Sequence, residues 1–139
     1  DIYGHGLFSA KLELAPLPLM SMVDIFPLVD ECFADLTGVQ GSLTEFGRQV
    51  RGKVLKCTGI PVGVGIAPTK TLAKLANHTA KRLQAQTGGV VDICDPFKRD
   101  WVLRNTEVKE VWGIGRRMTA RLETMGIRTA MDLAKTDPW

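Results

Sequence analysis

The stretch that decides the fold is residues 61–82, which reads PVGVGIAPTKTLAKLANHTAKR. Its first part, residues 62–67, alternates β-branched residues with glycine, a pattern typical of a buried strand. Glycine weakens a strand, so Gly63 and Gly65 predict that another backbone or a ligand comes close to this one. Pro68 and Thr69 then indicate a new element, because proline suits the first turn of a helix.

The helix that follows, from Thr69 to about Gln84, has two distinct faces. Apolar and small residues at helical spacing predict one buried face: Leu72, Leu75, Ala76, Thr79, Ala80 and Leu83. Basic residues on the same period predict a cationic stripe: Lys70, Lys74, His78, and Lys81 with Arg82. Lys70 stands at the helix N-terminus, where the helix dipole favours anions, so we expect the lysine and the dipole to face one phosphate. For Lys74 and Lys81, a solvated basic face is an equal alternative.

Two better-known phosphate loops are excluded at this turn. A Walker A loop has glycine directly before its lysine, where this chain has Thr69. A Rossmann fingerprint that begins at Gly63 requires glycine at the position of Pro68. The turn must therefore bind any phosphate with another geometry.

The composition is that of a globular protein, but the charge is unevenly distributed. The 139 residues are 45% hydrophobic and 24% charged, which suits one modest core, and no apolar run is long enough to span a bilayer. Three widely spaced cysteines fit neither a disulfide framework nor a zinc site and indicate reduced thiols. Residues 1–42 carry a net charge of −5 and residues 43–139 carry +8. This asymmetry favours polyanion binding, with plain solubility as the alternative.

The acidic part contains two neighbouring carboxylates, Asp30 and Glu31. We assign no structure to residues 1–22, and we expect strands at residues 23–26 and 32–36 on either side of the pair. Adjacent residues of a straight strand point to opposite faces, so the two carboxylates converge on one metal only at a bend or bulge. A polar hairpin corner is the alternative, and the spacing alone favours it.

A helix is predicted over residues 43–57, with Ser42 as N-cap and Glu45 as capping-box partner. Its inward residues are expected to be Leu43, Phe46, Val50, Val54 and Leu55. Strand 32–36, this helix and strand 61–67 predict a βαβ-like unit, with helix 69–85 packed on the sheet and a short strand at residues 90–93.

The sequence pattern becomes helical after residues 93–96. We place a domain boundary between Ile93 and Pro96, which predicts two domains, residues 1–94 and 95–139. The first helix, residues 97–104, is expected to point Trp101 and Leu103 inward.

Residues 108–138 then carry the pattern of a helix–hairpin–helix. Its hairpin is Gly113-Ile114-Gly115, and Gly126 and Thr129 mark the end of one helix and the cap of the next. The helix after the hairpin is expected to point Met118, Leu122 and Met125 inward and Arg116, Arg117 and Arg121 outward. Glycines in such a hairpin let backbone N–H groups approach a DNA phosphate without reading sequence. A small helical packing module is the alternative.

Three segments together resemble the UmuC-type Y-family translesion DNA polymerases: VDECFADLTG, GVGIAPTKTLAKLANHTAK and VWGIGRRMTARLETMGIRTAMDLA. The resemblance covers about residues 24–137. It implies an α+β fold, a partial polymerase palm with a mixed or antiparallel sheet and packed helices, followed by a small all-α helix–hairpin–helix thumb. It also implies error-prone, template-directed nucleotidyl transfer on damaged DNA, in the SOS response and in the bacterial cytoplasm.

The resemblance assigns roles to particular residues. Asp30 and Glu31 match the catalytic pair that ligates two Mg²⁺ ions, and Lys70 matches the lysine that contacts the triphosphate of the incoming dNTP. The expected DNA-binding residues are Lys74, Gly113, Ile114, Gly115, Arg116 and Arg117. The implied partners are primer-template DNA, a UmuD-like accessory subunit and a sliding clamp, with no membrane.

The chain also departs from the family pattern. The family's third metal carboxylate and its fingers have no counterpart in their usual context, and residues 26–29 read FPLV where the family has Tyr-Ser-Ile. We therefore expect this chain alone to be inactive as a polymerase. Two alternatives stand beside this reading: a non-catalytic DNA-binding module that works through residues 106–137, and a remnant that folds unstably.

Overall fold

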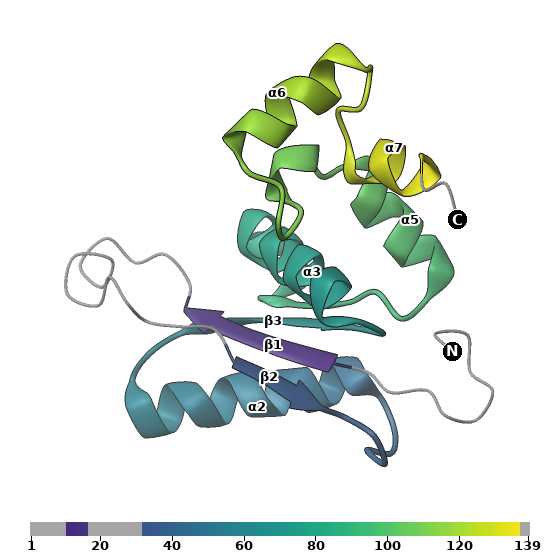
Figure 1. Ribbon diagram of the computed structural model, residues 1–139. Coiled ribbons are helices and arrows are strands. Elements are labelled where there is room, and N and C mark those ends of the chain that lie inside the picture. Colours follow the sequence, from purple (N-terminus) through teal and green to yellow (C-terminus); the bar gives the residue numbers. More distant parts are fainter. Residues whose placement is uncertain (1–10, 17–31, 137–139) are drawn as a thin grey trace.

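The computed structural model describes residues 11–16 and 32–136, a sheet covered by helices on both faces and followed by a small helical unit (Figure 1). Its elements are β1 Lys11–Pro16, β2 Cys32–Asp35, α2 Leu43–Thr58, β3 Val62–Ala67, α3 Lys70–Arg82, α4 Gln84–Thr87, β4 Val90–Asp92, α5 Pro96–Arg104, the 3₁₀ helix η1 Val108–Glu110, α6 Arg116–Thr124 and α7 Ala130–Lys135. The expected strand at residues 23–26 and the pair Asp30 and Glu31 lie outside the described residues. No helix in the described ranges is long and apolar enough to cross a membrane.

The sheet has the strand order β2-β1-β3-β4. β1 is antiparallel to both of its neighbours, whereas β3 and β4 are parallel. The predicted βαβ-like unit is present with a strand inserted: β2 and β3 are joined by α2 and run parallel to each other, and β1 lies between them. β1 comes from a segment to which we assigned no structure. A second βαβ unit, of directly paired strands, consists of β3, α3 with α4, and β4, and the mixed sheet with packed helices confirms the predicted α+β class.

β3 is buried along its whole length and has a different chemistry on each face. Val64 and Ile66 belong to the apolar cluster on the α2 side, whereas Ala67 belongs to the cluster on the α3 side. A Cβ atom placed on Gly65 would collide with the Ala73 carbonyl oxygen and the Asn77 backbone nitrogen of α3. The predicted close approach of another backbone is therefore confirmed at Gly65, and that backbone is α3.

The ends of α2 and α3 follow local chemistry. The Ser42 hydroxyl accepts the Glu45 N–H at 3.2 Å, which confirms the predicted N-cap of α2. α3 starts at Lys70 with Thr69 as its N-cap, so Pro68 precedes the helix and does not occupy its first turn as expected. Leu55, expected inward on α2, is 43% exposed.

The small helical unit has a narrower core than its periodicity predicts. Val108, Leu122 and Ile127 form its buried cluster. Met118 and Met125, expected inward, are 45% and 71% exposed, and Leu122 is the α6 residue that this cluster buries. On α5 the buried apolar residue is Val102, and Trp101, also expected inward, is 44% exposed.

One apolar cluster contains residues from both sides of the predicted domain boundary. Ala67 and Ala73 pack in it with Ile93, Val102 and Ala130. The division into two domains at residues 94 and 95 stays a prediction.

We predict that Gly65→Ala destabilises the fold by about 3 kcal/mol, because the added methyl group must separate α3 from β3. Chemical denaturation measures the change. Gly52→Ala is the matched control, since a Cβ at Gly52 of α2 meets no atom within 4 Å and alanine favours helix by up to about 1 kcal/mol. Equal stability of both variants would contradict the close approach.

The start of α7 predicts a dependence on pH. Backbone N–H groups of Arg128 and Thr129 donate to the Asp132 carboxylate and lower its pKa. A lowered folded-state pKa means that Asp132 stabilises the fold above its ordinary pKa, and that this contribution is lost as the pH falls through the lowered value. We expect Asp132→Asn to melt at a lower temperature than the parent chain at pH 7, with the difference shrinking below about pH 4. A difference that is constant from pH 7 to pH 3 would refute the role of this carboxylate.

Candidate nucleic-acid interface

Lys70 lies at the start of α3, and its side chain reaches Phe33 on β2. The Thr69 hydroxyl accepts the Leu72 N–H at 3.2 Å, and this cap fixes where the helix begins. From there the Lys70 ammonium nitrogen lies 5.4 Å from the centroid of the Phe33 ring on β2. A cation over a ring at an exposed site gains about 0.5–1 kcal/mol, which is enough to bias the direction of a flexible side chain.

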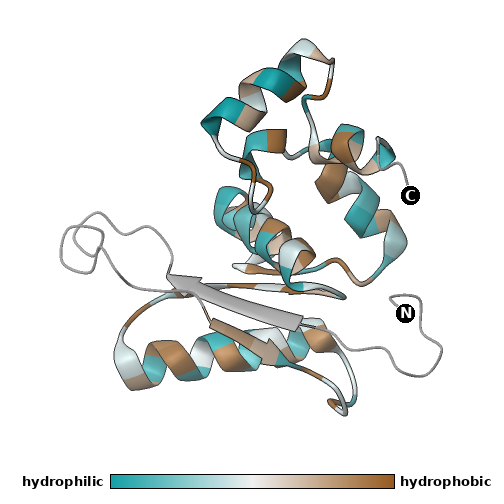
Figure 2. Ribbon diagram, viewed as in Figure 1, coloured by the Kyte–Doolittle hydropathy of each residue, from teal (hydrophilic) through white to brown (hydrophobic). Residues whose placement is uncertain are grey.

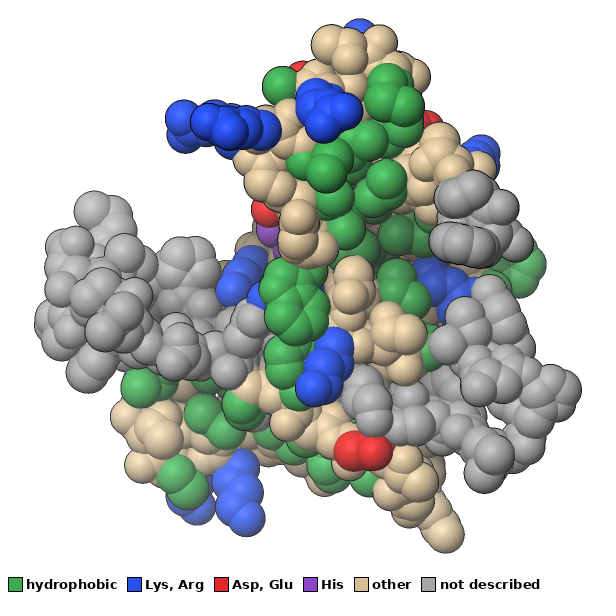
Figure 3. Space-filling model, viewed as in Figure 1, with side chains coloured by type: hydrophobic (Ala, Val, Ile, Leu, Met, Phe, Trp, Pro, Cys, Tyr) green, Lys and Arg blue, Asp and Glu red, His purple; other side chains and the backbone are tan. Residues whose placement is uncertain are grey.

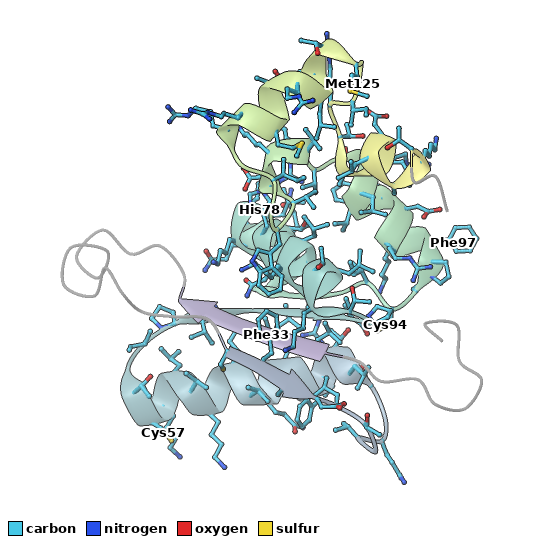
Figure 4. All side chains as sticks on the ribbon, in the orientation of Figure 1. Phe33, Cys57, His78, Cys94, Phe97 and Met125 are labelled. Atoms are coloured by element: carbon cyan, nitrogen blue, oxygen red, sulfur yellow. The ribbon has the colours of Figure 1, made fainter. Side chains whose placement is uncertain are left out.

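The next two members of the predicted stripe also have partners. The Lys74 ammonium nitrogen lies 4.8 Å from the centroid of the Trp112 ring, and His78 Nδ1 lies 3.6 Å from Glu110 Oε2, an ion pair when His78 is protonated. Phe33 and His78 lie toward opposite ends of this set of contacts (Figure 4). We use the name α3 row for Lys70, Lys74 and His78. The row faces β2 at one end and the segment before α6 at the other.

Two aromatic rings join the contacts of Lys70 and Lys74. Phe33 and Trp112 are stacked, with ring centroids 6.0 Å apart and an interplanar angle of 19°. Such a pair contributes about 0.5–1.5 kcal/mol beyond the area it buries. The stack joins β2 to the loop before α6, and Figure 1 shows this loop reaching toward α3.

The glycine hairpin is held in place from one side. Gly113 has a φ of +91°, which favours glycine, and the Ile114 N–H donates to the Val111 carbonyl oxygen at 3.0 Å. The Ile114 side chain packs against the cluster of Val108, Leu122 and Ile127. Ile114 therefore anchors the hairpin, and its expected contact with DNA stays a prediction.

The start of α6 offers donors and positive charge together. Gly115 is the N-cap and has no side chain to accept a hydrogen bond from the first N–H groups of the helix. Arg116 and Arg117 follow it and are exposed. Figure 2 shows the start of α6 as hydrophilic, and Figure 3 shows basic side chains protruding there. The helix dipole adds to these charges, so this end of α6 suits a phosphate.

An open groove of about 460 Å³ borders the hairpin. It is lined by Lys109, Glu110, Ile114, Gly115, Arg116, Thr119, Ala120 and Glu123. The Lys109 ammonium lies 3.1 Å from the Glu107 carboxylate, which raises the pKa of Lys109. Basic and acidic side chains both line the groove, and Lys109 is paired with Glu107. The positive end of the groove is therefore at Arg116.

The structure brings some of the predicted site residues together. Lys70 and Lys74 face the Phe33–Trp112 stack, and Trp112 directly precedes Gly113. Asp30 and Glu31 lie outside the described residues. Among the residues that the structure describes, no group of three or more His, Cys, Asp or Glu side chains could hold a metal ion.

Sequence reasoning missed three partners of the α3 row: Phe33, Trp112 and Glu110. Trp112 directly precedes the hairpin glycine in the sequence, but no local pattern links it to Phe33 on β2.

Two family models match this chain. One, described as the impB/mucB/samB family, matches residues 20–78, and the other, described as the IMS family HHH motif, matches residues 99–127. The chain is similar to protein UmuC of Salmonella typhimurium, 50% identical over 123 residues, which covers 87% of this chain and 29% of the relative. It is also similar to protein MucB of Escherichia coli, 49% identical over 135 residues, which covers 96% of this chain and 32% of the relative.

Solved structures agree with these matches. DinB from Sulfolobus solfataricus superposes with a TM-score of 0.60 and 28% identity, covering 78% of this chain and 31% of that one. A post-insertion binary complex of Dbh DNA polymerase gives a TM-score of 0.61 and 29% identity, covering 78% of this chain and 31% of that one. The chain thus spans about a third of the length of the proteins that it matches.

The family matches cover both parts of the chain, the sheet with its helices and the glycine hairpin between η1 and α6, and the solved structures share this fold. The chain belongs to the impB/mucB/samB family, the UmuC-type Y-family DNA polymerases.

Proposed function

We propose that this chain forms part of the palm and thumb of a UmuC-like, error-prone translesion DNA polymerase. The observation that carries this proposal is the contact of Lys74 with Trp112, because it joins two anion sites that lie far apart in the sequence. One is the start of α3 and the other is the glycine hairpin. The same side of the molecule therefore offers a lysine to a nucleotide and backbone donors with arginines to a DNA strand.

Lys70 is the proposed contact for the triphosphate of an incoming dNTP. Its side chain is exposed, and its ammonium lies over the Phe33 ring. A cation–π contact at such a site is weak, about 0.5–1 kcal/mol, whereas hydrogen bonds from an ammonium to a phosphate are charge-assisted and stronger. A triphosphate therefore holds the ammonium more strongly than the ring does.

Asp30 and Glu31 are the proposed ligands of Mg²⁺. Carboxylate oxygens are the donors that this ion prefers, so the pair fits it chemically. Glu31 stands two residues before Phe33 in the sequence. Because Phe33 contacts Lys70, chain connectivity supports one site for the pair and the lysine. Bound there, Mg²⁺ would neutralise charge on the phosphate oxygens.

The hairpin and the start of α6 are the proposed grip on the primer-template duplex. Gly113 and Gly115 leave the backbone accessible, and Arg116 and Arg117 supply charge next to it. Such contacts hold phosphates and position a duplex whatever its sequence. Lys74 is proposed to add to the same electrostatic surface.

The remaining partners rest on the resemblance alone. They are a UmuD-like accessory subunit and a sliding clamp, in a bacterial cytoplasm.

The DNA-binding proposal predicts the effect of removing two charges. In Arg116→Ala/Arg117→Ala we expect the affinity for a short DNA duplex to fall about tenfold or more at moderate salt. We also expect the slope of log K against log salt concentration to become shallower by about two, as counterion release requires. Fluorescence anisotropy across a salt series measures both quantities. Lys53→Ala/Lys56→Ala on α2 is the control with the same charge loss, and the proposal fails if it alters the slope as much.

The nucleotide-binding proposal predicts a loss of affinity for polyphosphate that is separate from the loss of affinity for DNA. In Lys70→Gln we expect inorganic tripolyphosphate to bind about tenfold more weakly, because one charge-assisted contact disappears, while duplex affinity stays within about twofold. Isothermal titration calorimetry measures the first effect, and Lys81→Gln, at the far end of the same helix, is the control. Unchanged tripolyphosphate binding, with duplex binding still dependent on Arg116 and Arg117, would reduce the function to a DNA-binding module.

A further inference from the structure

Trp112 makes two contacts that the anchoring of the hairpin does not require. Its ring stacks on Phe33 with a centroid distance of 6.0 Å, and its face carries the Lys74 ammonium at 4.8 Å. Trp112 is 52% exposed and belongs to none of the three buried apolar clusters of the described residues. The hairpin is held by Ile114, whose side chain packs against the cluster around Leu122. The ring of Trp112 thus has a place in the structure that core packing does not explain.

The four side chains form one continuous arrangement. Lys70 lies over Phe33, Phe33 stacks on Trp112, and Trp112 carries Lys74. The two lysines are one helical turn apart on α3, and the two rings come from β2 and from the loop before α6. Each ring therefore supports one lysine, and the stack keeps the two rings in a fixed relation.

We propose that Trp112 is a positioning residue, which together with Phe33 forms an aromatic seat that holds Lys70 and Lys74 ready for a polyphosphate. This inference rests on the proposed nucleotide-binding function of Lys70. It adds a residue next to the proposed DNA-binding hairpin to the support of the proposed nucleotide site. Trp112 touches no phosphate itself and acts through the lysines.

The physical basis is preorganisation. A lysine has a long flexible stem, and immobilising it on a ligand costs conformational entropy. A ring face restricts the ammonium to a small region before the ligand arrives, so part of that cost is already met in the free protein. Because the stack is shared, loss of the Trp112 ring removes the ring contact of Lys74 directly and loosens that of Lys70 through Phe33.

The test compares three variants of the 139-residue chain with tripolyphosphate as the probe. We expect Trp112→Leu, which keeps apolar bulk but removes the ring, to bind tripolyphosphate about threefold to tenfold more weakly. We expect Trp112→Phe, which keeps a ring, to bind within about twofold of the parent chain. Trp101→Leu is the matched control, since Trp101 is also exposed, at 44%, and lies on α5 away from the lysines. Calorimetry gives the affinities, and circular dichroism melts verify that each variant folds.

A double-mutant cycle separates positioning from general damage. If Trp112 acts through Lys74, then Trp112→Leu combined with Lys74→Gln loses less affinity than the product of the two single losses. Phe33→Leu, on the other side of the stack, provides a second variant and is expected to weaken tripolyphosphate binding in the same range.

The outcomes distinguish the inference from the function on which it rests. Weakening by Trp112→Leu with recovery in Trp112→Phe supports the seat. Unchanged binding in Trp112→Leu and Phe33→Leu, while Lys70→Gln still weakens it, overturns the seat and leaves the nucleotide site intact. A loss that is equal in Trp112→Leu and Trp112→Phe also overturns it, because a ring would then not be what matters. No effect of Lys70→Gln removes the nucleotide site and the seat together.

Discussion

The contact between α3 and β3 at Gly65 is the constraint on which the rest of the structure depends. Because residue 65 has no side chain, the helix backbone at Ala73 and Asn77 lies directly on the strand. The Asn77 side-chain amide also donates to the Gly63 carbonyl oxygen at 3.3 Å, so both glycines of the strand meet the helix. A helix held this closely at two points has little freedom to rotate about its axis. Its rotation in turn decides which side chains face β2 and the hairpin.

The α3 row is the consequence of that fixed rotation. Lys70 faces β2, whereas Lys74 and His78 face one short stretch before α6, residues 110–112. The shared apolar cluster beneath the row, which contains Ala73 and Ala130, keeps the sheet and the helical unit together. The basic row and the glycine hairpin are therefore presented on the same side of the protein, as the proposed function requires.

Local chemistry in the sequence predicted the elements but not how distant elements meet. The strand at Val62–Ala67, the Ser42 cap and the Gly113–Gly115 hairpin follow from patterns within a few residues, and the structure confirms them. β1 was not predicted, because both of its partners are non-local and its own pattern ends in a proline. Met118 and Met125 follow helical spacing, but the unit is too small to bury a wide face of α6. The Phe33–Trp112 stack joins distant segments, so no local pattern could reveal it.

The central claim is that the acidic pair Asp30 and Glu31 shares one site with Lys70, and paramagnetic relaxation by Mn²⁺ in solution NMR tests it most directly. Mn²⁺ accepts the same oxygen ligands as Mg²⁺ and broadens the signals of nearby nuclei. The account predicts that substoichiometric Mn²⁺ broadens the side-chain signals of Phe33 and Lys70 and leaves Met125, at the opposite end of the molecule, unaffected (Figure 4). Asp30→Asn/Glu31→Gln should abolish the effect. Broadening that survives in this variant, or that misses Phe33 and Lys70, would contradict the shared site.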